Sequence, residues 1–197
     1  MIRLLIATSN LHKVREIRNM LGRYEEIELI SLRAFPEYEP PEETGATFQE
    51  NALLKALHAS KLHSGLVLAD DSGLVVPSLQ GEPGVYSARY AGVGATEADN
   101  RKKLVERMSG LDEGLRGGHF VCALALVSPL GVIAQEEARC EGVILHKERG
   151  GQGHGYDSLF VKEGYRLTFA EISEETKNQV SHRRRALDKI LPALINR

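Results

Sequence analysis

Apolar runs and helically spaced apolar positions alternate along the first half of this chain. Residues 2–8 form a mostly apolar run that predicts a buried strand. A predicted helix follows, because apolar side chains recur on one face at Leu11, Val14, Ile17 and Leu21. This order, a strand followed by a helix, is typical of α/β proteins.

The next elements continue the same alternation and lead to an unusual strand end. Residues 28–32 predict a second strand, and the capping-box pattern at 47–50 predicts a helix that runs to about His63. Residues 66–69 predict a third strand that ends at two adjacent carboxylates, Asp70 and Asp71. Adjacent acids repel each other and are poor strand residues, so this position requires an explanation.

The second half of the chain is richer in strands than the first half. Strands are predicted at 74–79, 120–128, 132–137, 141–145 and 159–161. Helices are predicted at 96–108, after Ser173, and from Ser181 onward, where Pro192 is expected to end or bend the last helix. We therefore expect an α/β fold with a mixed sheet flanked by helices. Because we find no repeat or linker, we expect one domain spanning residues 1–197.

Composition and charge narrow the class of protein. The net charge of −2 argues against coating of nucleic acid by bulk positive charge. The longest apolar run, residues 120–127, is far shorter than the roughly 20 residues of a membrane span. The N-terminal MIRLLIATSN lacks a small-residue cleavage site, and Cys122 and Cys140 have no paired spacing for zinc. We expect a cytoplasmic protein with free thiols that binds neither nucleic acid nor membrane.

The turn after the first predicted strand has features of an anion site. Its residues are Thr8, Ser9, Asn10, Leu11, His12 and Lys13. A strand-to-helix turn presents backbone N–H groups and a helix N-terminus, which suit phosphate. A lysine in the first helical turn is unfavourable to the helix dipole unless it faces an anion. The alternative is that Asn10 caps the helix and Lys13 is solvated.

Carboxylates occur at two further predicted element ends. Glu42 and Glu43 precede the second helix, where acids are ordinary helix electrostatics. Asp70 and Asp71 should point to opposite faces of their strand, so one could face Mg²⁺ while the other supports the site. A turn built by Asp71, Ser72 and Gly73 is the alternative interpretation.

Two segments near the C-terminus add ligand-binding chemistry. The loop residues His154, Gly155, Tyr156 and Asp157 combine a glycine that allows close backbone approach to a ligand, rings that can stack on a base and a carboxylate that can accept hydrogen bonds. The alternative is a loop in which Tyr156 simply packs. At the start of the last helix, His182 and Arg183 can reach an anion, with Lys177 just upstream. Arg184 and Arg185 are expected to be solvated or to contact a partner. The combined set of cations, acids and base-binding groups suits a nucleoside triphosphate with Mg²⁺, with water as the nucleophile.

Five segments in order resemble the inosine triphosphate pyrophosphatase family, the dITP/XTP pyrophosphatases. They are ATSNLHKVREI, EETGATFQENALLKA, ADDSGLVVPSLQGEPGVYSARYAG, GHGYDSLF and SHRRRAL. The resemblance implies an elongated mixed sheet with two lobes around a cleft, and a homodimer. It also implies Mg²⁺-dependent hydrolysis of ITP, dITP and XTP to the monophosphate and pyrophosphate, which removes deaminated purines from the nucleotide pool.

The same resemblance assigns roles to individual residues. It implies that Asp71 is the proton acceptor and a metal ligand, with Asp70 and one of Glu42 or Glu43 as further acids of the metal site. The implied substrate contacts are Thr8 to Lys13, Lys55, Ser72, His154 to Asp157, Lys177, His182 and Arg183. Lys13, Lys55 and Arg183 would offset the charge of the phosphates.

Two departures from the family pattern leave the substrate open. The family usually has Gly at the position of Ser9, and Phe and Pro at the positions of His154 and Ser158. His154 can stack on a purine but adds a titratable ring, which bears on base preference. The alternatives are a Maf-type pyrophosphatase acting on other nucleotides and a nucleotide-binding protein without turnover, which would not need Asp70 and Asp71.

Overall fold

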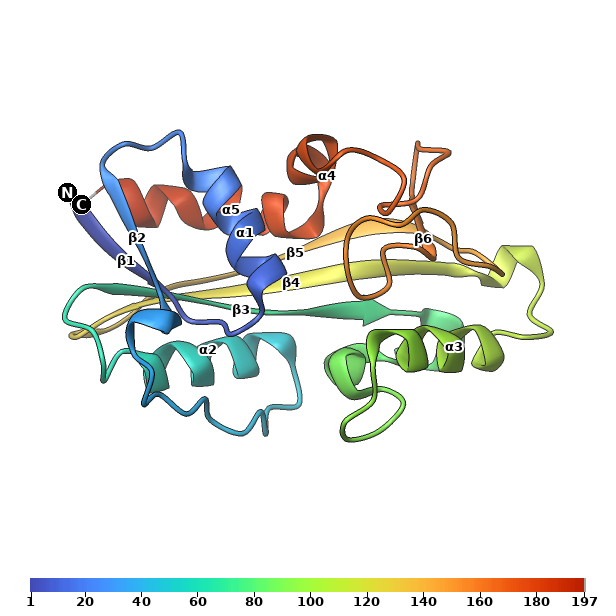
Figure 1. The fold of residues 1–197 in the computed structure, drawn as a ribbon, viewed down its shortest axis with the longest axis horizontal. Coiled ribbons are helices and arrows are strands. Elements are labelled where there is room, and N and C mark those ends of the chain that lie inside the picture. Colours follow the sequence, from blue (N-terminus) through green and yellow to red (C-terminus); the bar gives the residue numbers. More distant parts are fainter. Residues whose placement is uncertain (197) are drawn as a thin grey trace. The chain divides into compact units, whose positions relative to one another are not determined.

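The computed structural model describes residues 1–196, which form a mixed sheet with helices on both sides (Figure 1). The strands are β1 (Ile2–Ile6), β2 (Ile27–Ser31), β3 (Leu66–Val75), β4 (Gly117–Ser128), β5 (Gly131–Ile144) and β6 (Phe160–Lys162). The α-helices are α1 (Leu11–Leu21), α2 (Phe48–Ala59), α3 (Glu97–Arg107), α4 (Glu174–Val180) and α5 (His182–Ile195). The strand order is β2-β1-β3-β4-β5-β6. The predicted α/β class with a mixed sheet is confirmed.

The chain forms two compact units. Unit 1 comprises Met1–Asp71, Cys122–Ala138 and the described residues from Arg183 onward, and unit 2 comprises Ser72–Val121 and Arg139–His182. Strands β3, β4 and β5 each contribute residues to both units. Each unit has its own apolar core.

Unit 1 is built on parallel strands. Strand β1 pairs in parallel with β2, with Leu4 opposite Leu29, and with β3, with Leu4 opposite Leu66. Helices α1 and α5 cover one face of these strands and α2 covers the other (Figure 1). Parallel strands covered on both faces have nearly continuous apolar runs, which is why a strand could be predicted over residues 2–8, where the structure has β1.

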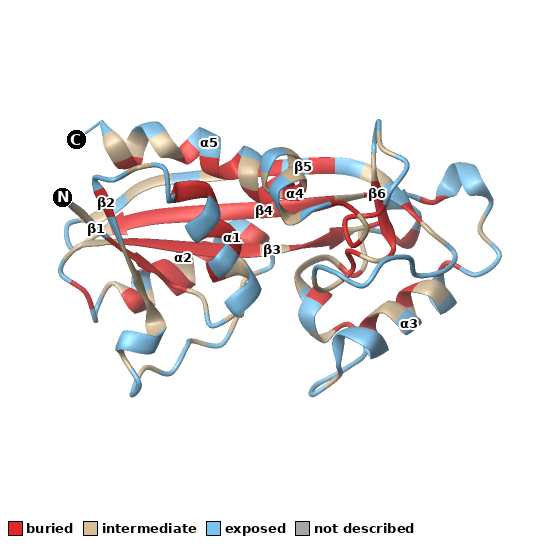
Figure 2. Ribbon diagram, turned by 45° about the horizontal axis from the view of Figure 1, so that its top comes forward, coloured by how far each residue is buried: buried red, intermediate tan, exposed pale blue. Residues whose placement is uncertain are grey.

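Unit 2 contains the antiparallel pair of β5 and β6, with Val143 opposite Val161. Helices α3 and α4 lie on opposite sides of its strands (Figure 1). Figure 2 shows that β3 and β4 are buried over most of their length, and in β4 this includes Cys122 through Val127. The aromatic rings of Phe120, Phe160 and Phe169 pack together in the core of this unit.

Several predicted boundaries are wrong, and the largest error concerns β3. The predicted strand 66–69 and the first two residues of the predicted strand 74–79 belong to one strand that runs through Asp70 and Asp71 to Val75, while Pro77–Leu79 form a 3-10 helix. The two carboxylates are tolerated in mid-strand because each forms ion pairs with cations from other segments. The predicted strands 132–137 and 141–145 are likewise the single strand β5.

The helices were predicted more accurately, with two exceptions. Helix α2 ends at Ala59, earlier than the predicted His63. Helix α5 continues through Pro192 to Ile195, so the proline does not end it. Within residues 1–196, no helix has both the length and the apolar character needed to cross a membrane.

Candidate functional site

The two adjacent aspartates of β3 interact with different sets of partners in unit 1. The Asp70 carboxylate accepts hydrogen bonds from Lys13 Nζ at 2.5 Å and Arg183 Nε at 2.8 Å. The Asp71 carboxylate accepts a hydrogen bond from Lys55 Nζ at 2.7 Å. Successive strand residues point to opposite faces, so the two carboxylates meet cations from different segments of the chain.

Asp70 is a fully buried anion that is held in the charged state by its neighbours. Burial by itself would raise its pKa, but the charges of Arg183 and Lys13 outweigh burial and hold the pKa well below its usual range. The thiol of Cys122 on β4 also donates to Asp70, at 3.1 Å. Burial and the Asp70 charge raise the pKa of the Cys122 thiol well above its usual value, so this cysteine stays protonated.

A second buried acid, Glu16, completes the ion-pair group around Arg183. Arg183 at the start of α5 contacts Glu16 of α1 through Nη1, and its side chain is only 1% exposed. Burial lowers the pKa of Arg183 less than the charges of Asp70 and Glu16 raise it. Arg183 therefore connects α1, β3 and α5 as a permanently charged group inside the protein.

Asp71 has a different environment, because one of its oxygens has no polar contact. Burial raises the pKa of Asp71, and the opposing charges of Lys55 and Lys13 only partly offset this effect. Lys55 of α2 also donates to Glu43 at 3.0 Å, so Lys55 lies between two carboxylates. The second Asp71 oxygen, Oδ2, is buried and has no hydrogen-bond partner among residues 1–196.

The turn between β1 and α1 places several predicted residues close to the aspartates. The Asn10 side chain accepts hydrogen bonds from the backbone N–H groups of His12 (2.9 Å) and Lys13 (3.2 Å), so it caps α1. The Asn10 N–H donates to the Thr8 hydroxyl at 3.2 Å. Ser9, Leu11 and His12 are exposed on this turn. The expected anion partner of Lys13 is, in this structure, Asp70.

The acids on β3 and before α2 fit the donor set of Mg²⁺. Magnesium is usually held by one or two carboxylates together with phosphate oxygens and water. Asp71 offers the buried Oδ2, and Glu43 shares Lys55 with Asp71, whereas Glu42 is exposed. Among residues 1–196, no three or more His, Cys, Asp or Glu side chains cluster as metal ligands. Phosphate oxygens and water would therefore need to complete the coordination.

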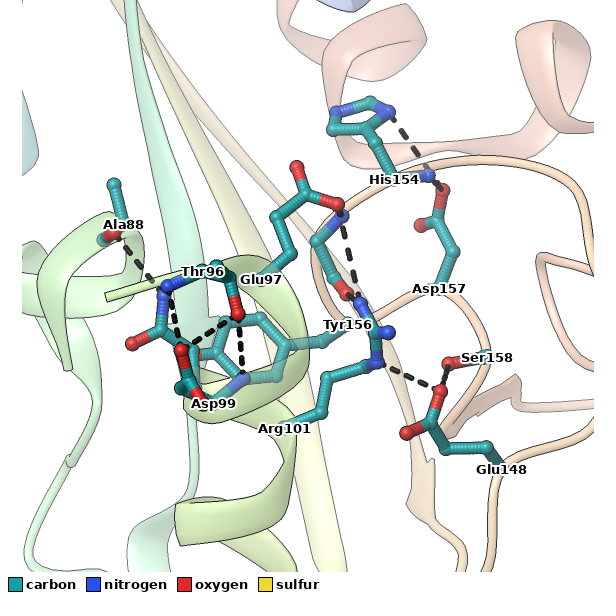
Figure 3. Close-up of polar contacts among 12 residues, drawn as sticks. Ala88, Thr96, Glu97, Asp99, Arg101, Glu148, His154, Tyr156, Asp157 and Ser158 are labelled. Atoms are coloured by element: carbon teal, nitrogen blue, oxygen red, sulfur yellow. Dashed lines mark hydrogen bonds and ion pairs between the residues drawn. The ribbon is translucent and has the colours of Figure 1, made fainter. Parts of the chain in front are cut away.

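In unit 2, the residues predicted to bind a base form a tight loop. The Asp157 carboxylate accepts hydrogen bonds from the His154 N–H at 2.9 Å and from Lys177 Nζ at 2.5 Å. The His154 ring lies 3.8 Å from the same carboxylate oxygen (Figure 3). The buried Tyr156 hydroxyl donates to the Ser87 carbonyl at 2.9 Å. The predicted residues 154–157 and Lys177 thus form one polar cluster.

The remaining predicted residues have distinct environments. His182 is buried and stacks on Phe120 with a centroid distance of 4.8 Å. Ser72, which follows Asp71 in β3, is partly buried. Arg184 pairs with Asp188 one turn along α5 at 2.8 Å, and Arg185 is exposed.

Several residues that contact these clusters, Ser87 and Glu97 among them, were not predicted as site residues from the sequence. Glu16 and Cys122 each contact the Asp70 group, and Arg101 contacts the loop at Gly155. Glu16 carries a weak signal, since it is an acid beside the apolar positions Val14 and Ile17 of a helix. Cys122 and Arg101 reach their partners only through tertiary folding, across 52 and 54 residues of sequence.

Comparison with known proteins gives matches over nearly the whole chain. A sequence model of the Ham1 family matches residues 4–193. A dITP/XTP pyrophosphatase of Protochlamydia amoebophila is 50% identical over 194 residues, covering 98% of each chain. A dITP/XTP pyrophosphatase of Chlamydia abortus is 45% identical, covering 98% of this chain and 94% of that one. The solved structure of a HAM1 protein from Coxiella burnetii is 37% identical, covers 100% of both chains and has a TM-score of 0.88.

Proposed function

We propose that this chain, which belongs to the Ham1 family, hydrolyses deaminated purine nucleoside triphosphates such as dITP, ITP and XTP to the monophosphate and pyrophosphate. The observation that carries the proposal is the arrangement around Asp71, a buried carboxylate with one oxygen paired to Lys55 and the other without a hydrogen-bond partner in the described part of the chain. The chain that has this arrangement is 50% identical to a relative named dITP/XTP pyrophosphatase.

Asp71 is the proton acceptor in the proposed reaction. Water attacks the α-phosphorus, its proton passes to Asp71, and the bond from the α-phosphorus to the bridging oxygen breaks. The pyrophosphate leaves with that oxygen. Water forms the new bond, so no covalent bond between enzyme and nucleotide is needed.

The lysines of unit 1 supply charge for the phosphates. Lys13 and Lys55 each hold a carboxylate at hydrogen-bond distance, and phosphate oxygens would compete for the same ammonium groups. The turn of Thr8, Ser9, Asn10, Leu11 and His12 offers backbone N–H groups to the same anion. The Arg183 side chain is buried and bound to Asp70, so we propose that Arg183 keeps Asp70 ionised in addition to offsetting phosphate charge.

Mg²⁺ is the proposed cofactor, held by Asp71 and Glu43, with Asp70 nearby as a supporting charge. When bound, the ion would neutralise phosphate charge and stabilise the charge that develops on pyrophosphate. Glu43 is preferred over Glu42 because Glu43 shares Lys55 with Asp71.

Base recognition is assigned to unit 2, to His154, Gly155, Tyr156, Asp157, Lys177 and His182, with Ser72 as a further substrate contact. Lys177 can donate to a 6-oxo group, and Asp157 holds Lys177 in place. An amino group at the same position of adenine would face a donor instead of an acceptor, and rejection of guanine requires that the site offer no partner to its exocyclic amine. Such mismatches discriminate strongly. We further propose one functional domain that acts as a cytoplasmic homodimer, which light scattering after size exclusion would test.

The deciding experiment is a substrate panel with product analysis. Purified protein with Mg²⁺ should release pyrophosphate from dITP, ITP and XTP and far less from ATP or GTP. Release of orthophosphate would contradict the proposal. A preference for pyrimidine nucleotides would favour the Maf-type alternative, and binding without any turnover would favour a regulator.

A further inference from the structure

Helix α3 holds both backbone polar groups of Gly155, in the middle of the 153–158 loop. The Gly155 N–H donates to Glu97 Oε2 at 2.9 Å, and the Gly155 carbonyl accepts from Arg101 Nη1 at 3.0 Å. Figure 3 shows the Glu97 and Arg101 side chains extending from α3 toward this loop. They lie one helical turn apart, and their charged groups approach to 3.9 Å. One helix face therefore fixes the peptide groups on both sides of one loop residue.

The same arginine also connects to the end of the loop. Arg101 Nε donates to Glu148 Oε2 at 2.7 Å, and the Ser158 hydroxyl donates to that same oxygen at 2.8 Å (Figure 3). The planar guanidinium of Arg101 can bind the Gly155 carbonyl and the Glu148 carboxylate at once, because its N–H groups are fixed in a fork. The Arg101 side chain is only 19% exposed, so water competes weakly for these hydrogen bonds.

The loop needs such external support, because its backbone lies outside the strands and helices. Gly153 and Gly155 have φ angles of +78° and +59°, values that suit glycine. Within the loop, the His154 N–H donates to the Asp157 carboxylate and the Asp157 N–H donates to the His154 carbonyl. These bonds define the shape of the loop. The contacts with Glu97 and Arg101 join those of Tyr156 with Ser87 and of Asp157 with Lys177 in fixing where the loop lies on unit 2.

We propose that Glu97 and Arg101 are positioning residues for base selection, acting through Gly155 on the His154 and Asp157 side chains that flank it. This proposal rests on the proposed function, in which the loop binds the purine. Neither residue is required to touch the nucleotide. Loss of the contacts lets the loop adopt other positions, which weakens discrimination between a 6-oxo and a 6-amino base.

Hydrogen exchange tests the mechanical step without any substrate. Arg101→Ala should increase amide exchange in a peptide covering residues 153–158 by at least about tenfold, because it removes two charged hydrogen bonds and the loss of one alone corresponds to about that factor. Lys102→Ala is the matched control, since Lys102 is the next residue of α3 and its side chain is 77% exposed. Arg101→Lys should give an intermediate increase, because lysine keeps the charge but lacks the fork. Unchanged exchange in Arg101→Ala would overturn the proposal.

Product binding tests the consequence for base selection. The ratio of the Kd values for AMP and IMP, measured by calorimetry, should fall at least about fivefold in Arg101→Ala and stay within twofold of wild type in Lys102→Ala. In substrate kinetics, the same loss of discrimination between the two bases should appear in the KM values. The kcat for dITP should stay within about twofold of wild type. Faster loop exchange with an unchanged Kd ratio would overturn the link to selection.

The two proposals can fail separately. If the wild type binds IMP over AMP but does not hydrolyse dITP, the proposed function fails and the binding ratio still decides the role of α3. If Arg101→Ala does not fold, Glu97→Ala removes the acceptor of the Gly155 N–H and should give the same exchange and binding changes. Wild-type behaviour of that variant in both measurements would overturn the inference.

Discussion

The carboxylate of Asp71 is bound to the ammonium group of Lys55 at 2.7 Å through one oxygen, while its other oxygen is buried and has no hydrogen-bond partner among the residues that the structure describes. We expect Asp71→Asn to lower kcat by about 10²- to 10⁴-fold, the usual contribution of a positioned general base. Binding of the nucleotide should persist, because the lysines remain. Steady-state kinetics with pyrophosphate detection and calorimetry measure the two quantities. Asp188→Asn, at an exposed position of α5, is the control, and near-wild-type kcat in Asp71→Asn would exclude Asp71 as the base.

Asp70 should matter mainly for stability. Asp70→Asn leaves Arg183 buried with less compensating charge, and breaking a buried ion pair typically costs about 3–5 kcal/mol of unfolding free energy. Urea denaturation followed by circular dichroism measures this loss. Asp188→Asn should change stability by less than about 0.5 kcal/mol, because surface pairs contribute little. A loss of under 1 kcal/mol in Asp70→Asn would contradict the role of Asp70 as the counter-ion of Arg183.

Glu43 and Glu42 form a natural matched pair for testing the metal site. Glu43→Gln should raise the Mg²⁺ concentration needed for half-maximal activity by about tenfold, because residues near a metal typically affect affinity by 10- to 100-fold. Glu42→Gln should have little effect, since Glu42 is exposed. The rise of Tm on adding Mg²⁺ and pyrophosphate gives a second readout that needs no turnover. Equal effects of the two substitutions would remove the distinction between them.

His154 should tune base preference without taking part in hydrolysis. His154→Phe removes the approach of the ring nitrogen to Asp157 at 3.8 Å and keeps an aromatic face. We expect the ratio of kcat/KM for dITP over dGTP to change by about 2- to 10-fold, the scale of a single aromatic contact, with kcat for dITP preserved. Identical kinetics on every purine would remove His154 from the base site.

Tyr90 makes stability fall at alkaline pH. Burial and a 2.6 Å hydrogen bond to Glu82 raise the pKa of Tyr90 to about 12 from the ordinary 10.0. The folded state therefore holds this proton more tightly than the unfolded state, so the stabilisation is complete below pH 10 and is lost as the pH rises towards 12. When the pH is raised from 8 to 11, the unfolding free energy should fall in both proteins. In Tyr90→Phe the fall should be smaller than in wild type by on the order of 1 kcal/mol, measured by urea denaturation. Tyr86→Phe, at an exposed ring, should follow the wild-type curve.

Sequence pattern predicted the elements whose signals are local. The apolar run of β1, the helical spacing of α1 and the capping box at Thr47 each depend on residues a few positions apart, and the structure has these elements where they were predicted. The order of five motifs was specific enough to indicate the family, which the comparisons established. These features need no knowledge of which distant residues meet.

Tertiary structure decided what the two neighbouring acids of β3 do. Their sequence suggested a strand end, because adjacent carboxylates are unfavourable within a sheet. The strand continues because Lys13 and Arg183 meet Asp70 on one side and Lys55 meets Asp71 on the other. Arg183 lies 113 residues away from Asp70 along the chain, and no local pattern encodes that distance. The sequence by itself determined the family and those elements whose signals are local. The balance between burial and long-range charge pairs decided which aspartate is a permanent anion and which one has an oxygen without a hydrogen-bond partner among residues 1–196.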